Sequence, residues 1–447
     1  MASGSKSSPA VEPIREDPNS GLLAKSLHGF YDLAWYAVVL LGSPWLVLKG
    51  LRDRGFRAMV LERLGMGLPR LSADAPARVL IHGVSVGETK GAQSLVQRLR
   101  EAAPGVEIVF STSTSTGQEV ARQLYPDLEV VRFPVDPAPV VSRFLSRLRP
   151  TAIVLVELEI WPNFLRAANR RGIPVAVVNG RITDRSYGRY ELFRSLFPQF
   201  NRISMFCAQS DVYAERFRSL GVEDERIVVT GNVKVDGLEV GRAEPGGELK
   251  RLLGADDERP VIVAGSTHDP EERMLLEACA RAVPEARLIL VPRHPDRAPS
   301  IVEQCAAHGL TLHRLTELRD GLVEPDPSVP ALVDTIGELE AVYGLADIAF
   351  VGGSLIPHGG QNVLEPAAQG LPVVFGPHVE NFYQEVALLE QSDACRRVED
   401  ARELEGVLLE LCGDADLRAR YGAAAQAVVA AQRGATDLTW AALERLL

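Results

Sequence analysis

Short, largely apolar runs separated by longer helical segments are the feature that most constrains the fold of this chain. Seven runs lie in the first half, at 78–82, 107–110, 129–131, 152–156, 174–178, 203–207 and 227–229. Five more lie at 260–264, 287–291, 331–333, 347–351 and 372–375. Continuous apolar strands are typical of a parallel sheet that is covered on both faces. Because the strands alternate with helices, the sequence predicts doubly wound α/β domains.

A polar segment at 236–257 separates the two sets of strands. It predicts two Rossmann-like domains, and ligands in such sheets bind at the carboxyl ends of the strands. We therefore expect these ends to face a shared cleft. The predicted organisation is a flexible tail at 1–20, a membrane-anchor helix with a basic flank at 21–72, an N-terminal domain at 73–240 and a C-terminal domain at 241–447.

Composition excludes several classes of protein. The chain has 447 residues, of which 46% are apolar and 24% charged, and these values argue against disorder, collagen and a disulfide scaffold. A formal net charge of −11 argues against a nucleic-acid partner. The five cysteines lack CxxC spacing and pairing with histidine, which indicates reduced thiols in the cytosol and no metal site.

The segment before the first domain is apolar and then basic. Residues 33–48 carry no charge, and as a helix they would measure roughly 24 Å, short of a bilayer core of about 30 Å. Pro44 would kink such a helix. Trp35 and Trp45 edge it, and no small-residue cleavage site follows it. The basic residues after it are Lys49, Arg52, Arg54, Arg57 and Arg63. This pattern predicts a segment in an anionic membrane surface, with the bulk of the protein cytoplasmic; the alternative is a buried core helix.

The first predicted strand runs into the sequence HGVSVGE at 82–88. Its glycines permit a tight turn, and Glu88 falls in the first turn of the helix that follows. A carboxylate there can act as a general base toward a bound hydroxyl. It can equally cap the helix and offset its dipole.

The sequence STSTSTG at 111–117 follows the second strand. Hydroxyls and a glycine ahead of a helix suit contacts with an anion or a sugar. The same string also makes an adequate N-cap loop.

The fourth strand ends in VELEIWPN at 156–163. Glu157 and Glu159 are two residues apart, so on a strand they would point the same way. Two carboxylates on one face repel unless they have a cationic or hydroxylated partner. They are either functional groups or scaffolding that is salt-bridged to Arg166 or Arg181.

Three cations follow later strands of the first domain. Arg181 and Arg185 could bind a phosphorylated acceptor, or they could be solvated surface residues. Lys234 lies at the predicted seam between the domains. It could stabilise developing negative charge or form an interdomain ion pair.

The second half contains an anion-binding pattern. Arg293 follows a strand and is placed to bind a phosphate, and His294 is the next residue. Residues 334–338 precede a helix, and a pair of glycines at 359–360 lets backbone N–H groups approach a ligand. Asn362 and Glu365 share a helical face, where Glu365 could accept hydrogen bonds from a ribose; the alternative is that these residues only support the loop. The chain lacks GxGxxG after its first strand and lacks GxxxxGK[ST], which disfavours dinucleotide and P-loop sites.

Together these strings resemble the Kdo (3-deoxy-D-manno-octulosonic acid) transferases of lipopolysaccharide assembly, from about residue 27 to past residue 390. The strings that carry the resemblance are HGVSVGET, STSTSTG, VELEIWPN, VNGRITDRS, GNVKVD, GSTHDPEE, VPRHP, DTIGELE and GGQNVLEPAAQGLPVVFGPHVENF. The family usually has His where Gln361 stands, and Ala or Ser where Gly83 stands.

The resemblance implies an inverting, metal-independent glycosyltransferase of the GT-B type, without a cofactor. It implies CMP-Kdo as donor and the 6′-hydroxyl of a tetraacylated lipid A precursor as acceptor, at the cytoplasmic face of the inner membrane. By similarity Glu88 is the general base that deprotonates the acceptor hydroxyl, and Glu157 and Lys234 stabilise the transition state. Glu159 is a neighbour of these residues. Arg181 and Arg185 would face the acceptor phosphates. The implied CMP pocket consists of Pro292, Arg293, Ile336, Gly337, Glu338, Asn362, Val363, Leu364 and Glu365.

Two other functions fit the residues. One is a GT-B transferase that uses a UDP-sugar, or a UDP-sugar epimerase of similar fold. The other is a membrane-tethered sugar-binding module without turnover.

Overall fold

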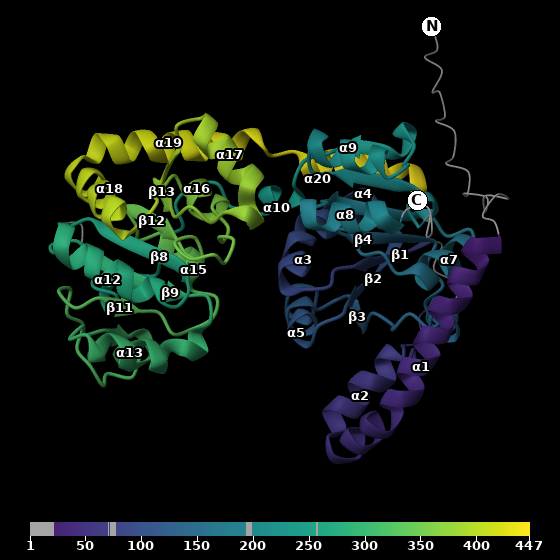
Figure 1. Ribbon diagram of the computed structural model, residues 1–447. Coiled ribbons are helices and arrows are strands. Elements are labelled where there is room, and N and C mark those ends of the chain that lie inside the picture. Colours follow the sequence, from purple (N-terminus) through teal and green to yellow (C-terminus); the bar gives the residue numbers. More distant parts are fainter. Residues whose placement is uncertain (1–21, 70, 72–76, 194–198, 256–257) are drawn as a thin grey trace, which may run out of the picture. The chain divides into compact units, whose positions relative to one another are not determined.

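The computed structural model describes residues 22–69, 71, 77–193, 199–255 and 258–447, and the contacts divide the chain into two units (Figure 1). The first unit runs to Gly237 and also includes Arg433–Leu447; the second unit is Leu238–Gln432. The predicted tail at 1–20 lies outside the described residues.

The first unit is built on a parallel seven-stranded sheet in the order β3-β2-β1-β4-β5-β6-β7. Its strands are β1 Ala77–His82, β2 Val106–Thr112, β3 Glu129–Arg132, β4 Ala152–Val156, β5 Val175–Gly180, β6 Met205–Ala208 and β7 Ile227–Val229. Its helices after the first strand are α3 Val86–Gly91, α4 Gln93–Ala102, α5 Ser115–Leu124, α6 Ala138–Leu148, α7 Pro162–Arg170, α8 Asp184–Phe193, α9 Asp211–Ser219, α10 Val233–Asp236 and α20 Ala435–Leu443. Short 3₁₀ turns lie at Phe200–Arg202, Asp224–Arg226 and Glu444–Leu446.

Both faces of this sheet are buried. Along β1, Leu80 packs into one apolar cluster with α6, α7 and α9, whereas Val79 and Ile81 pack into another with α4 and α20. Successive side chains of a strand point to opposite faces, so a strand with helices on both sides is apolar at every position.

The second unit repeats the plan with the order β10-β11-β9-β8-β12-β13-β14, again all parallel. Its strands are β8 Val261–Thr267, β9 Arg287–Pro292, β10 His313–Arg314, β11 Ala331–Leu332, β12 Ile348–Val351, β13 Val373–Phe375 and β14 Cys395–Arg397. Its helices are α11 Gly247–Leu252, α12 Glu271–Ala282, α13 Ala298–Ala307, α14 Leu315–Arg319, α15 Leu339–Tyr343, α16 Leu364–Ala368, α17 Tyr383–Gln391, α18 Ala401–Gly413 and α19 Ala415–Ala431. Short 3₁₀ turns lie at Pro295–Arg297 and Glu380–Phe382.

The predicted fold class, two doubly wound Rossmann-like domains, is confirmed, and each predicted apolar run overlaps a strand. The prediction missed β10 and β14. These are edge strands of two and three residues that carry histidine and arginine, so they lack the apolar run on which the prediction depends.

The last helix corrects the predicted domain boundary, which assigned all of 241–447 to the second domain. Asp236 at the end of α10 accepts hydrogen bonds from the backbone N–H groups of Gly434 (2.8 Å) and Thr436 (2.5 Å), and so caps α20. Trp440 then packs into the core of the first unit beside α4. The chain therefore returns to the first unit after Gln432.

The segment before the first sheet forms two helices, α1 Leu22–Arg52 and α2 Arg54–Arg63, which contact each other. Near its start α1 is tied to the first unit: the Tyr31 hydroxyl donates to Asp136 (2.9 Å), and Asp32 pairs with Arg166 (3.2 Å). Most of residues 38–51 are exposed and apolar. The alternative of a buried core helix is therefore wrong.

Candidate active site

Glu88 lies in the first turn of α3, where the chain leaves β1. Ser85, the N-cap residue, donates its hydroxyl to Glu88 Oε1 (3.1 Å), and its Oγ lies 3.5 Å from the Glu88 backbone nitrogen. Glu88 Oε2 accepts a hydrogen bond from the Val84 N–H (2.5 Å). The carboxylate therefore does close the turn before α3, as one of the two interpretations of the sequence expected.

The surroundings of Glu88 also suit a proton acceptor. Burial and the nearby carboxylates of Glu157 and Glu159 raise the pKa of Glu88 to about 7, against the opposing effect of its hydrogen bonds. A general base works best when its pKa lies near the working pH. Capping and base catalysis are therefore compatible at this position.

Glu157 forms an ion pair with Lys234, with Oε1 and Nζ 2.5 Å apart. Lys234 passes directly over α3, because a Cβ at Gly91 would lie only 2.7 Å from Lys234 Cγ. Both partners belong to the first unit. The alternative of an interdomain ion pair is therefore wrong for Lys234, which instead forms an ion pair with Glu157 beside the helix that carries Glu88.

The strand geometry expected for Glu157 and Glu159 is wrong. β4 ends at Val156, and Glu157 has a positive φ of 64°, a backbone conformation that side chains other than glycine rarely adopt. Glu159 accepts a hydrogen bond from Trp161 Nε1 (3.0 Å), and burial raises its pKa. The expected scaffold partner Arg166 is instead bound to Asp32.

The structure places Arg181 directly after β5 and half-buried. The side chain of Arg185 is outside the described residues. Asn179, near the end of β5, has a φ of 55° and accepts a hydrogen bond from the Val233 N–H (3.1 Å). This contact joins the end of β5 to the helix that carries Lys234.

The predicted donor residues follow β9, β11 and β12, which lie with β8 as four neighbours in the second sheet. Arg293 follows Pro292, the last residue of β9, and is exposed. Ile336 is 90% exposed, and Gly337 has a φ of 89°. Glu338 pairs with Arg319 (2.9 Å).

The predicted nucleotide loop after β12 is internally bonded. Asn362 Nδ2 donates to Glu365 Oε1 (3.0 Å), and Asn362 Oδ1 accepts from the Leu364 N–H (3.1 Å). Val363 and Leu364 are buried, so their side chains pack inside the protein.

Three histidines gather at this edge, of which the sequence analysis named only His294. The ring of His268 lies 4.0 Å from that of His358 and 5.8 Å from that of His294. Gln361 Nε2 lies 3.3 Å from His268 Nε2. Burial, followed by the charges of these histidines and nearby arginines, lowers the pKa of His268 to about 4. This edge therefore suits an anionic ligand.

Sequence reasoning also missed the role of Glu271, a fully buried carboxylate at the start of α12. It accepts hydrogen bonds from four backbone N–H groups: His268 (3.0 Å), Gly353 (2.6 Å), Ser354 (3.0 Å) and Leu355 (3.0 Å). It thereby fixes the loop after β8 to the loop after β12. The acidic pair in GSTHDPEE was the available signal.

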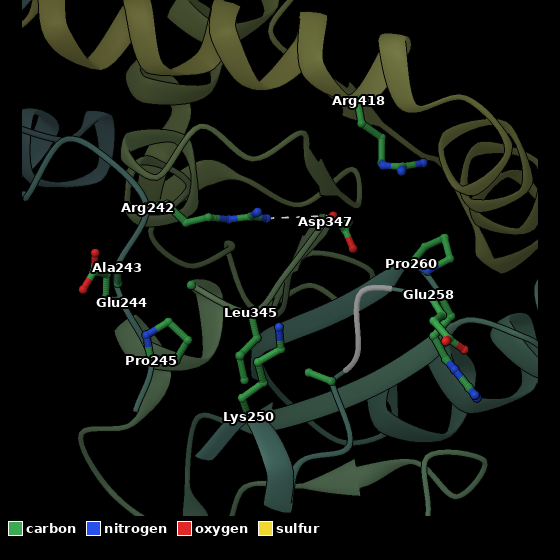
Figure 2. A pocket seen from close by; sticks show the side chains of 13 residues that line it. Arg242, Ala243, Glu244, Pro245, Lys250, Glu258, Pro260, Leu345, Asp347 and Arg418 are labelled. Atoms are coloured by element: carbon green, nitrogen blue, oxygen red, sulfur yellow. Dashed lines mark ion pairs between the residues drawn. The ribbon is translucent and has the colours of Figure 1, made fainter. Parts of the chain in front are cut away.

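A cavity of ≈ 710 Å³ lies at the opposite end of the second sheet (Figure 2). Pro260 and Asp347, which precede β8 and β12, line it, and Arg242 points toward Asp347 across it, 3.9 Å apart. Ligands of doubly wound sheets bind at carboxyl ends, so this cavity is not the candidate donor site.

Comparison with known proteins decides the family. A family model described as 3-deoxy-D-manno-octulosonic-acid transferase (kdotransferase) matches residues 58–237. The 3-deoxy-D-manno-octulosonic acid transferase of Haemophilus influenzae is 32% identical over 90% of this chain and 92% of its own length. That of Bordetella pertussis is 33% identical over 93% of this chain and 98% of its own length.

The chain belongs to the Kdo transferase family. It is therefore a glycosyltransferase, and the resemblance inferred from the motifs is confirmed.

Solved structures support the fold of this Kdo transferase family member. Anabaena HepE in complex with UDP aligns with a TM-score of 0.57 at 15% identity, covering 83% of this chain and 99% of its own. A glycosyltransferase from Rickettsia africae aligns with a TM-score of 0.57 at 14% identity, covering 83% and 97%. At these identities the likeness concerns the GT-B fold alone.

Two further features bear on this family member. Residues 26–52 of α1 form a helix that is long and apolar enough, by length and composition, to cross a membrane. The expected short segment of 16 residues is thus part of a continuous helix of 31 residues that includes Pro44.

Among the described residues, no three His, Cys, Asp or Glu side chains group in a way that could hold a metal ion.

Proposed function

We propose that this chain transfers Kdo from CMP-Kdo to the 6′-hydroxyl of a tetraacylated lipid A precursor, with inversion and without a metal ion. Membership of the Kdo transferase family supports the transferred sugar. The observation that carries the chemistry is Glu88, a half-buried carboxylate with a pKa raised to about 7 at the carboxyl edge of the first sheet.

The reaction needs one proton acceptor and one stable leaving group. Glu88 takes the proton from the acceptor hydroxyl, and the oxygen attacks the anomeric carbon of Kdo from the face opposite CMP. The bond from that carbon to the phosphate oxygen breaks, and CMP leaves with the electron pair. Lys234, held by Glu157 beside α3, supplies positive charge near the reacting groups.

The second unit binds the donor in this proposal. Arg293 and the histidine cluster face the anionic groups of CMP-Kdo, and charge-assisted hydrogen bonds to a phosphate are the strong ones. Asn362 and Glu365, already bonded to each other, are placed for the ribose hydroxyls. Glu271 fixes the positions of the loops after β8 and β12 relative to each other.

The helices before the first sheet bring the enzyme to its lipid substrate, at the cytoplasmic face of the inner membrane. Exposed apolar side chains cover α1 beyond its polar contacts with the first unit, among them Leu40 and Leu41. Lys49 and Arg52 follow in its last turn. Apolar surface next to basic residues is what binds an anionic lipid surface.

Product mass spectrometry tests the proposal. The full-length protein is mixed with CMP-Kdo and tetraacylated lipid A precursor, and each added Kdo raises the product mass by one sugar unit. Parallel reactions with UDP-sugars test the alternative donors. Transfer from a UDP-sugar alone, or donor binding with no product, would contradict the proposal.

A further inference from the structure

Two arginines from different parts of the chain meet beside the candidate active site. Arg63 is the last residue of α2, and Arg132 is the last residue of β3. The Val135 N–H donates to the Arg63 carbonyl (3.0 Å), which fixes the end of α2 on the segment after β3. The two guanidinium groups are close enough that Arg132 lowers the pKa of Arg63, after the larger effect of burial.

The positive charge of this pair is only partly offset. Glu62 binds Arg132, with Oε2 and Nε 2.9 Å apart. Arg63 Nε is buried and has no hydrogen-bond partner among the described residues. An unpartnered buried donor on a charged group is costly unless a ligand satisfies it.

A hydroxyl of the serine-rich loop lies against Arg132 of this pair. Arg132 Nη2 lies 3.5 Å from Ser115 Oγ, in the first turn of the ten-residue helix α5. Ser113 Oγ is buried and, within the described part of the chain, also lacks a partner. Arginines, hydroxyls and the N-terminal end of a helix are together the groups that bind phosphate.

This loop is attached to the loop of the candidate base. The Thr112 hydroxyl and the Thr114 N–H both donate to the Val84 carbonyl (3.1 and 3.3 Å). β3 and β1 are separated by one strand, so their ends lie about 10 Å apart. A group bound at the arginines would thus lie about 10 Å from Glu88, which is the length of one or two sugar rings.

We propose that Arg63, Arg132 and the Ser113–Ser115 loop bind a phosphomonoester on the lipid acceptor and so position its hydroxyl at Glu88. The inference rests on the proposed function and adds a site on the β3 side of Glu88, opposite Arg181 on the β5 side. Because Arg63 ends the helix that packs on α1, the same segment both contacts the membrane anchor and holds the headgroup.

The test compares R63Q and wild type in transfer assays with the full-length protein. The acceptors are the bisphosphorylated lipid A precursor and its two monophosphorylated forms. R63Q is expected to raise KM for the bisphosphorylated acceptor about 10-fold or more, the usual effect of losing a charge-assisted hydrogen bond. It should leave kcat within about 2-fold, because Arg63 does not take part in proton transfer. On the form that lacks the bound phosphate, R63Q and wild type should be equal.

Controls separate this site from a structural or bulk-lipid role. R63K should retain most of the affinity, and R122Q, at the exposed far end of α5, should match wild type. Although Arg63 belongs to the basic flank by sequence, it is half-buried against the segment after β3, so flotation with phosphatidylglycerol vesicles should be the same for R63Q and wild type. Acceptor binding without donor is measured in parallel, so the site is tested even if transfer from CMP-Kdo fails. An unchanged KM, an equal loss on every acceptor form, or weaker flotation would overturn the inference.

Discussion

The carboxyl edges of the two sheets belong to similar parallel seven-stranded sheets but differ in chemistry. In the first unit this edge carries Glu88, Glu157 and Glu159, and burial and mutual repulsion raise the pKa of Glu88 to about 7. In the second unit it carries arginines and three histidines, and their surroundings lower the pKa of His268 to about 4. The part of the first edge at β1 and β4 thus suits a proton acceptor, whereas the second edge suits an anion. The shared fold fixes where the sites are, and the residues in the loops decide what they do.

The loops at the two edges are also fixed by different kinds of contact. In the first unit a side-chain ion pair, Glu157–Lys234, lies next to the helix of Glu88. In the second unit the buried carboxylate of Glu271 joins two loops through their backbone N–H groups. The first arrangement affects the charge at the site, whereas the second fixes its shape. This contrast yields four predictions.

The largest effect is expected at the base. E88Q keeps the shape of the side chain but cannot accept the proton, so kcat should fall at least about 10²-fold. Binding of CMP, measured by calorimetry, should remain as in wild type because Glu88 belongs to the other unit. Turnover of E88Q close to that of wild type would contradict the assignment of Glu88 as the general base.

On the opposite edge, R293A should act on the donor. Loss of a charge-assisted hydrogen bond to phosphate should raise KM for CMP-Kdo about 10- to 100-fold, with a smaller change in kcat. Steady-state kinetics with varied donor measure this. R251A, an exposed arginine of α11, is the matched control and should leave KM unchanged. An effect of R293A on the acceptor KM alone would contradict the assignment of the edges.

The pH profile should follow Glu88. The base works only when it is deprotonated, so kcat/KM should rise with pH up to about 7, the raised pKa of Glu88. Below that value it should fall about tenfold per pH unit. A profile that is flat between pH 5 and 8 would mean that no group of this pKa takes part.

The smallest effect is expected from removing the charge of Glu157, which influences the pKa of Glu88. E157Q removes a negative charge that raises the pKa of Glu88, and it also frees the positive charge of Lys234. Both changes lower the pKa of Glu88, so the acid limb of the profile should move about 0.5–1 unit to lower pH. E159Q should give a smaller shift, because Glu159 contributes less to the pKa of Glu88. A shift to higher pH would contradict the electrostatic coupling.

Much of the architecture could be predicted from the sequence. Apolar runs identify the buried parallel strands, since a strand covered on both faces needs apolar side chains at every position. The glycine-rich turn after β1 placed Glu88 in the first helical turn, as the structure has it. The edge strands β10 and β14 and the return of α20 to the first unit gave no such local pattern.

The sequence by itself determined the α/β class, the family and the position of Glu88 at a strand end, because strand period, turn chemistry and motif order are local. Only the tertiary structure decided that Lys234 pairs with Glu157, 77 residues away, and that Arg63 meets Arg132. It also decided that Glu271 is buried beneath two loops. Such contacts depend on which strands become neighbours, and in a doubly wound sheet the strand order differs from the chain order.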